Sequence, residues 1–305
     1  MKYVTIAILV LVLLGGGYYV YTQRSTLFAT ANPPATEPSP AEPASTTEAT
    51  TSAPAVQASG QEVIGKSVEE RDIVAYHFGT GSEELLFVAG IHGGYEWNTV
   101  LVANQLIEYL GENPDAVPAG VKVTVIPTLN PDGLAKVTSD AVGFSASDIT
   151  ASQATQVEGR FNANDVDLNR NFDCDWKASG IWQNKAVSGG SKAFSEPESR
   201  AFREYVESHP ITAAVVWYSS AGGVFASNCH GGVLQETSDL TALFAKASGY
   251  KPYASFDFYA ITGDAVNWLA KQKIPAISVL LTTHTDVEWD KNLKGVLAVL
   301  EHYAD

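Results

Sequence analysis

The sequence predicts an α/β domain over residues 61–305, with a mixed, mostly parallel central sheet flanked by helices. One N-terminal transmembrane helix and a disordered linker are expected to precede it. Three observations support this architecture. Short apolar or β-branched segments alternate with segments of helical periodicity throughout the domain. Residues 275–282, "PAISVLLT", are nearly all apolar, as expected of a strand buried on both faces. Residues 4–21 are apolar except for Thr5, close to the ~20 residues that span a bilayer.

Residues 1–24 are therefore predicted to be a membrane anchor or a signal segment, with Lys2 before the apolar block and Arg24 after it. The only small-residue cleavage site, at 29–31, lies too far beyond that block, which favours an uncleaved anchor. Such an anchor places the domain outside the cytoplasm, at the cell surface or on the periplasmic side. Residues 25–60 are rich in Pro, Ala, Ser, Thr and Glu and predict a disordered linker.

Within the domain, enrichment in apolar and β-branched residues predicts strands at 73–78, 84–91, 121–127, 211–218, 222–227 and 275–282. Helical periodicity predicts helices at 96–111, 196–208, 236–249, 264–272 and 287–303. In open α/β sheets, ligands bind beyond the carboxyl ends of the strands. A site is therefore expected where strands 84–91, 211–218 and 275–282 end.

The net charge of −15 argues against binding to nucleic acid or to anionic lipid. The chain has two cysteines, Cys174 and Cys229. In an exported protein a disulfide is allowed, and two cysteines permit only one pairing. Two unrelated buried thiols are the alternative.

His92 directly follows an apolar strand, and Glu96 opens the next helix. A neutral imidazole and a carboxylate are both good zinc ligands, and Gly93 and Gly94 allow a sharp turn between them. The alternative is an ordinary turn, in which His92 is a polar loop residue and Glu96 complements the helix dipole.

A polar run at 159–176 carries three further candidates. Arg170 offers a planar fork that matches a carboxylate, and Asn169 can add an amide donor. Arg160 could stabilise negative charge on a carbonyl oxygen. In the alternative, the charges of this loop pair with its own acids, Asp165, Asp167 and Asp173.

Together with the His92 and Glu96 pair, "NPDG" at 130–133, "DLNRNF" at 167–172 and "FSEPES" at 194–199 resemble the M14 (carboxypeptidase A-like) zinc carboxypeptidases. The resemblance covers residues 61–305 and implies the fold of that family. It implies zinc as the cofactor, with His92 and Glu96 as the first two ligands.

The resemblance also implies roles for the remaining candidates. Arg160 would stabilise the oxyanion, while Asn169 and Arg170 would hold the terminal carboxylate of a peptide. The segment 259–268 resembles the one with the family's mobile tyrosine, which makes Tyr259 its counterpart. Asp264 would face the side-chain pocket and favour a basic or amine-bearing terminal residue, such as diaminopimelate.

The sequence departs from the family pattern at three places. Three residues, rather than two, separate His92 from Glu96. Ser219, or Tyr218 if the alignment shifts by one, stands where the third zinc ligand is a histidine. Leu280, or Leu281 if the alignment shifts by one, stands where the family has its catalytic glutamate, and leucine cannot transfer a proton. His230 and His284 lie near the expected pocket rim and are candidates to replace the missing ligand.

Cys174 closely follows "NRNF", and Cys229 follows the strand at 222–227. Both segments would border the same pocket in this fold, so the resemblance predicts a disulfide that fixes the carboxylate-binding loop. With the predicted anchor, the resemblance implies a membrane-anchored, extracytoplasmic zinc metallocarboxypeptidase that acts on peptides, including cell-wall stem peptides. The alternatives are a catalytically inactive member that only binds peptide C-termini, and a scaffold with a vestigial site.

Overall fold

The computed structural model describes residues 60–139 and 143–304. The predicted anchor and all of the linker before Gly60 lie outside the described residues. Within the described ranges, no helix has the length and apolar character needed to cross a membrane.

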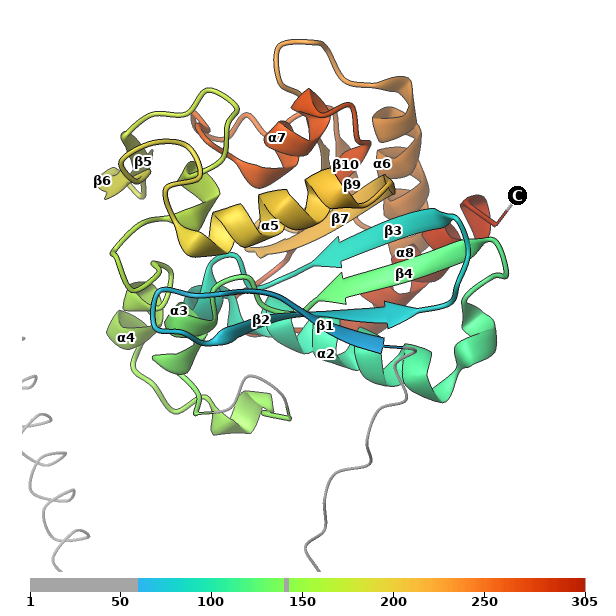
Figure 1. The fold of residues 1–305 in the computed structure, drawn as a ribbon, viewed down its shortest axis with the longest axis horizontal. Helices are drawn as coiled ribbons and strands as arrows, with labels where there is room; N and C mark the ends of the chain where they lie inside the picture. The colour runs from blue at the N-terminus through green and yellow to red at the C-terminus, as the bar shows by residue number, and fades with distance from the viewer. Residues whose placement is uncertain (1–59, 140–142, 305) are drawn as a thin grey trace, which may run out of the picture. The chain divides into compact units, whose positions relative to one another are not determined.

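An eight-stranded mixed sheet runs through the domain in the order β1-β2-β4-β3-β7-β10-β8-β9 (Figure 1). Its strands are β1 (Gly60–Lys66), β2 (Asp72–Phe78), β3 (Glu83–Val88), β4 (Val121–Ile126), β7 (Ile211–Ser219), β8 (Gly223–Ala226), β9 (Lys251–Tyr253) and β10 (Ala276–Leu281). Neighbouring strands are parallel from β4 through β3 and β7 to β10, and between β8 and β9. The β1–β2, β2–β4 and β10–β8 pairs are antiparallel. The predicted mixed, mostly parallel sheet is confirmed.

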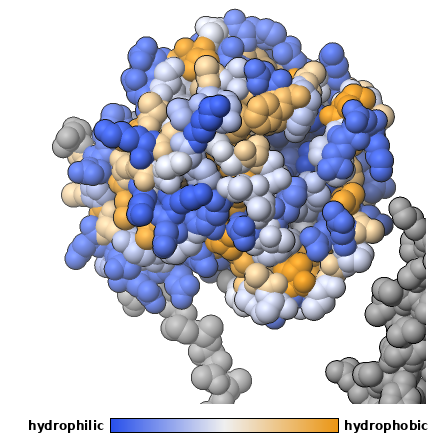
Figure 2. All heavy atoms as spheres, turned by 180° about the vertical axis from the view of Figure 1, so that it is seen from behind, coloured by the Kyte–Doolittle hydropathy of each residue, from blue (hydrophilic) through white to orange (hydrophobic). Residues whose placement is uncertain are grey.

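Helices cover both faces of this sheet (Figure 1). On one face α2 (Trp97–Glu112), α6 (Gln235–Ser248) and α8 (Trp289–His302) pack over Trp217 and Leu281. On the other, α5 (Pro197–Ser208) and α7 (Ala265–Lys271) pack over Tyr218 and Leu280. The alternation follows from the two-residue period of a strand, in which successive side chains point to opposite faces. The first helical layer is seen from outside in Figure 2, where hydrophilic surface predominates and the hydrophobic patches are scattered.

Shorter elements connect these layers. They are α3 (Pro131–Ala135), α4 (Gln153–Glu158), the 3₁₀ turns η1 (Gly93–Glu96), η2 (Pro114–Ala116), η3 (Ala146–Asp148) and η4 (Leu168–Arg170), and a hairpin of β5 (Ser179–Trp182) with β6 (Lys185–Ser188). Cys174 and Cys229 form a disulfide, as predicted. It joins the loop after η4 to the loop after β8.

Candidate functional site

A cavity of about 490 Å³ lies at the carboxyl ends of β3, β7 and β10. These strands run parallel, so their ends meet at one edge of the sheet. The predicted site residues that line the cavity are His92, Glu96, Arg160, Asn169, Ser219, Tyr259, Asp264, Leu280 and His284. The cavity thus lies at the edge of the sheet where the site is expected, and the roles of these residues stay predictions.

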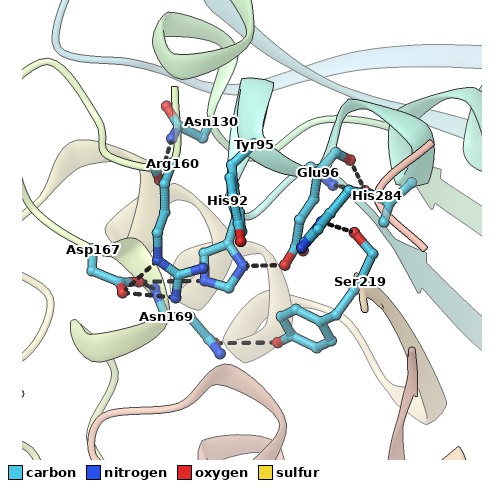
Figure 3. A network of polar contacts seen from close by, with 12 residues as sticks. His92, Tyr95, Glu96, Asn130, Arg160, Asp167, Asn169, Ser219 and His284 are labelled. Carbon is cyan, nitrogen blue, oxygen red and sulfur yellow. Dashed lines mark hydrogen bonds and ion pairs between the residues drawn. The ribbon is translucent and has the colours of Figure 1, made fainter. Parts of the chain in front are cut away.

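His92 and Glu96 lie at the two ends of the η1 turn. Gly93 has φ of 43°, and a Cβ there would lie 2.8 Å from the carbonyl oxygen of Gly159, so the turn requires glycine. Nδ1 of His92 lies 2.9 Å from Oε1 of Glu96 (Figure 3), but the contact lacks hydrogen-bond geometry. Both ring nitrogens of His92 and Oε2 of Glu96 are buried without a hydrogen bond to any described residue. The two side chains therefore bring together nitrogen and oxygen atoms that are free of hydrogen bonds and could bind a metal ion.

Asp167 lies behind His92, with Oδ1 3.4 Å from Nε2 of the imidazole. Arg160 donates two hydrogen bonds to Oδ2 of Asp167, from Nε at 3.0 Å and Nη2 at 2.8 Å. Burial by itself would raise the pKa of Asp167, but Arg160 and His92 outweigh it and hold the pKa well below its usual value. The guanidinium of Arg160 also stacks on Trp182, with Cζ 4.5 Å from the ring centroid.

Arg170 is the second buried arginine of this loop, 1% exposed. Its Nη1 donates to the carbonyl oxygen of Asn169 at 2.9 Å, and Nη2 to that of Ile181 at 3.3 Å. Its Nε has no hydrogen-bond partner, and among the described residues no carboxylate forms an ion pair with it. Tyr259 lines the cavity with its ring centroid 5.9 Å from Cζ of Arg170, which places the guanidinium beside the cavity wall. The charge-pairing alternative holds for Arg160 and not for Arg170.

Asn169 is fixed by three neighbours. Its Oδ1 accepts from the Tyr218 hydroxyl at 3.2 Å and from the backbone N–H of Ala265 at 3.1 Å, and its Nδ2 donates to Asp264 at 3.0 Å. Asp264 also caps α7, accepting from the N–H of Asn267 at 2.8 Å. Burial raises the pKa of Asp264.

The two candidates for the third-ligand position point in different directions. Tyr218 faces the cavity, and its ring centroid lies 5.7 Å from that of His92. The Ser219 hydroxyl donates to Oδ1 of Asn98 on α2 at 3.2 Å and lies 2.8 Å from Nδ1 of His284. Strand alternation therefore favours Tyr218 over Ser219 as the counterpart of the missing histidine. Burial raises the pKa of Tyr218 well above its usual value, so its hydroxyl is protonated.

Leu280 lines the cavity and is paired in register with Tyr218. Leu281, the alternative by one position, packs into the core under α6 and α8. The cavity thus has an apolar side chain at the position where the resemblance expects the catalytic acid.

The donors of the site do not fit a catalytic zinc centre, which takes three protein ligands and a water. His92 and Glu96 would supply two. Tyr218 and Ser219 offer only neutral hydroxyls, and both are engaged in hydrogen bonds. Among the described residues, no group of three or more His, Cys, Asp or Glu side chains converges well enough to hold an ion.

The two histidines considered as replacements differ in position. His284 lines the cavity, with Nδ1 bonded to Ser219, and burial lowers its pKa. His230 is exposed and lies 2.7 Å from Asp175 on the surface. Of the two, only His284 belongs to the cavity.

Several residues that line the cavity were not predicted from the sequence. Tyr95 lies in η1, and Trp182 and Gln183 lie at the tip of the β5–β6 hairpin. Further aromatic side chains, Phe225, Phe256 and Phe258, contact one another and also line the cavity. The aromatic run "YASFDFY" at 253–259 is the signal that could have indicated this wall.

Comparison of the sequence with known protein families identifies the family of this chain. A sequence profile described as zinc carboxypeptidase, peptidase M14, matches residues 55–252. The chain belongs to the zinc carboxypeptidase family. The predicted resemblance is confirmed, although the matched part ends before Tyr259, Asp264 and Leu280.

Curated members of the family are similar to part of the chain. Carboxypeptidase Z of Rattus norvegicus is 27% identical over 185 residues, covering 56% of this chain and 26% of the relative. The carboxypeptidase N catalytic chain of Homo sapiens is 29% identical over 191 residues, covering 56% of this chain and 37% of the relative. The chain thus spans well under half the length of either.

Several solved structures share the fold. Murein-tripeptide amidase MpaA of Escherichia coli O157 superposes with a TM-score of 0.56 at 20% identity, over 79% of this chain and 91% of that one. Bovine thrombin-activatable fibrinolysis inhibitor gives a TM-score of 0.63 at 16% identity, over 80% and 90%. At these identities the likeness concerns the fold alone.

Proposed function

We propose that this protein is a carboxypeptidase-like protein that takes the C-terminal end of a peptide into the cavity. The observation that carries the proposal is Arg170, a buried guanidinium with no acidic partner among the described residues. Asp167 and Asp264 act on this charge without forming an ion pair with it, and a buried charge that lacks a direct partner is costly. A peptide carboxylate would supply the missing anion, and Asn169 beside it supplies an amide donor to the same group.

A binding experiment tests this assignment. Acetylated tripeptides with a free C-terminal acid, and the same peptides as C-terminal amides, are titrated into the full-length chain by calorimetry. The free acid is expected to bind at least tenfold more tightly, because a hydrogen bond to a charged group contributes about 1.5–3 kcal/mol. Arg170→Ala should remove the difference.

Two further variants sharpen this test. Arg170→Lys keeps the charge but loses the planar fork, so it should retain part of the preference. Arg200→Ala is the matched control, since Arg200 binds the backbone carbonyls of Phe194 and Ser195 away from the cavity. Equal binding of acid and amide by the unaltered protein would contradict the proposal.

Hydrolysis of the terminal peptide bond is the second candidate function. It is favoured by family membership and by the unpaired donor atoms of His92 and Glu96, which are the ligands a metal would use. Two residues argue against hydrolysis. Leu280 cannot act as the general base, and the neutral hydroxyl of Tyr218 does not replace an imidazole ligand. Stoichiometric zinc in the purified protein, with chelator-sensitive release of the terminal residue, would establish hydrolysis and exclude a purely binding role.

The peptide and its location complete the proposal. A bacterial cell-wall stem peptide is a candidate ligand, supported by the fold shared with murein-tripeptide amidase MpaA and by Asp264 in the cavity wall, which suits an amine-bearing terminal residue. The apolar segment at 4–21 and the Cys174–Cys229 disulfide support a membrane-anchored protein outside the cytoplasm.

A further inference from the structure

Tyr218, at the end of β7, packs beside His92. Leu280 of β10 pairs with Tyr218 of β7, and directly paired residues on parallel strands point to the same face. The Tyr218 ring lies 5.7 Å from the His92 ring, centroid to centroid. Tyr218 therefore occupies space that a third ligand next to His92 would need.

The hydroxyl of this tyrosine reaches the side chain assigned to carboxylate binding. It donates to Oδ1 of Asn169 at 3.2 Å. The same oxygen accepts from the backbone N–H of Ala265, which can only donate, so the oxygen end of the amide is fixed. Nδ2 donates one hydrogen to Asp264. One amide hydrogen of Asn169, a cavity-lining residue, is left for a ligand.

We propose that Tyr218 is a positioning residue, which holds the Asn169 amide in the orientation that binds a peptide's terminal carboxylate. The inference rests on the proposed function and deepens it. The end of β7, which carries a tyrosine in place of a metal-binding histidine, would then contribute to recognition of the peptide's carboxylate. The gain comes from preorganisation, because an amide already held in its binding orientation loses less freedom when the ligand arrives.

The test compares Tyr218→Phe with the unaltered full-length chain, using the acetylated free-acid tripeptide and its C-terminal amide as probes. The variant keeps the ring against His92 and removes only the hydroxyl. We expect affinity for the free acid to fall about fivefold, the effect of one neutral hydrogen bond, with no change for the amide. Tyr250→Phe is the control, because Tyr250 is a buried tyrosine that donates to Glu288 and does not line the cavity.

The outcomes separate this inference from the proposed function. If the unaltered chain prefers the free acid and Tyr218→Phe keeps that preference in full, the positioning role is overturned alone. The same holds if the variant weakens acid and amide equally, since that is a merely structural effect. If the unaltered chain has no preference, the proposed function fails and this inference fails with it.

A measurement on the unaltered chain covers the case in which the variant does not fold. The side-chain amide protons of Asn169 should give distinct, slowly exchanging NMR signals. These should shift when the free-acid peptide is added, and should not shift with the amide. Rapidly exchanging, averaged amide signals would overturn the positioning role.

Discussion

Arg160 and Arg170 are both buried in the same loop, yet their charges are balanced differently. Arg160 is held by two hydrogen bonds to Asp167 and by the face of Trp182. Arg170 donates to two backbone carbonyls and lies beside Tyr259, its Nε has no hydrogen-bond partner, and no described carboxylate forms an ion pair with it. A fixed ion pair serves to orient its members, whereas an unpaired buried cation attracts an anion. The two arginines are therefore suited to different tasks, with Arg170 the one available to a ligand's carboxylate.

The metal site can be tested by restoring the family's residues. In Tyr218→His with Leu280→Glu, the imidazole would lie beside His92 and the carboxylate would face the cavity. We expect zinc content to rise from well below one to about one per chain, with chelator-sensitive release of the terminal residue, because three ligands and a general base are then present.

The matched control for this variant is Ser219→His with Leu280→Glu. Ser219 lies on the opposite face of β7 from Tyr218, where its hydroxyl contacts Asn98 and His284, so an imidazole there should not complete the site with His92. Metal analysis of the two variants decides between the positions. Zinc retained by the Ser219 variant alone would contradict the assignment made from strand alternation.

Asp264 provides a prediction about pH. Peptides ending in lysine are expected to bind about tenfold more tightly than those ending in leucine at neutral pH, because the carboxylate lines the cavity. Since burial raises the pKa of Asp264, the group becomes neutral on acidification earlier than an ordinary aspartate, whose pKa is about 3.9. The preference should therefore disappear as the pH falls through this raised value.

Asp264→Asn tests this assignment, because asparagine can still cap α7 and so leaves the helix intact. Titrations of both peptides across the acidic range measure the preference. The variant should bind them equally at every pH. A lysine preference that persists in Asp264→Asn would contradict the role of this acid.

At the scale of elements, the sequence predicts the strands and helices that have a strong apolar pattern. All six expected strands and all five expected helices exist, with ends within three residues of the predicted ones. The missed strands are weak in this signal. β1 is an edge strand whose residues are mostly exposed, β9 has three residues, and β5 and β6 have four each. Tertiary contacts, such as Trp182 of β5 on Arg160, hold the hairpin in place, and the local pattern does not encode them.

In the candidate site, too, some features are predictable from the sequence and others depend on the tertiary structure. The motifs shared with the zinc carboxypeptidases were enough to predict that His92, Glu96, Asn169 and Asp264 belong to one site, and all four line the cavity. The choice between Tyr218 and Ser219 depends on which face of β7 each occupies, and a one-residue shift reverses that face. Only the observed register with β10 decides it.

The disulfide links two loops at the cavity and yields a stability prediction. Cys174 and Cys229 are separated by 55 residues, and closing a loop of this size removes chain entropy worth about 4 kcal/mol. Cys174→Ala with Cys229→Ala should lower the free energy of unfolding by up to about this amount in urea titrations. Reduction of the unaltered protein should reproduce the loss.

The same variant should weaken binding of free-acid peptides. The carbonyl oxygen of Cys174 accepts from the N–H of Gly263, whose own carbonyl accepts from Phe172, so the bridge supports the backbone next to Arg170. Affinity for the C-terminal amide gives the baseline. An unchanged urea midpoint together with unchanged binding would contradict this role.

For the whole molecule, the cavity depends on the sheet and its two helical layers, all within the described residues. β3, β7 and β10 bring His92, Tyr218 and Leu280 to one edge, and their parallel pairing fixes that meeting point. The family match covers residues 55–252, which include β3, β7 and the loop around Arg170 but not β10. The scaffold thus forms the cavity with a tyrosine and a leucine, Tyr218 and Leu280, at these two strand ends.

The predicted anchor and the domain should be separable. The full-length chain is expected to sediment with membranes, while a variant lacking residues 1–59 should remain in the supernatant and bind free-acid peptides with unchanged affinity, since the cavity residues all follow Gly60. Leu11→Arg with Leu13→Arg is the control, because two charges in the apolar block make insertion unfavourable by several kcal/mol. If that variant still sediments, or if the shortened chain does, attachment occurs through another surface of the protein. If peptide binding is lost on truncation, the site requires residues before Gly60, and the assignment of the cavity as a self-contained binding site is wrong.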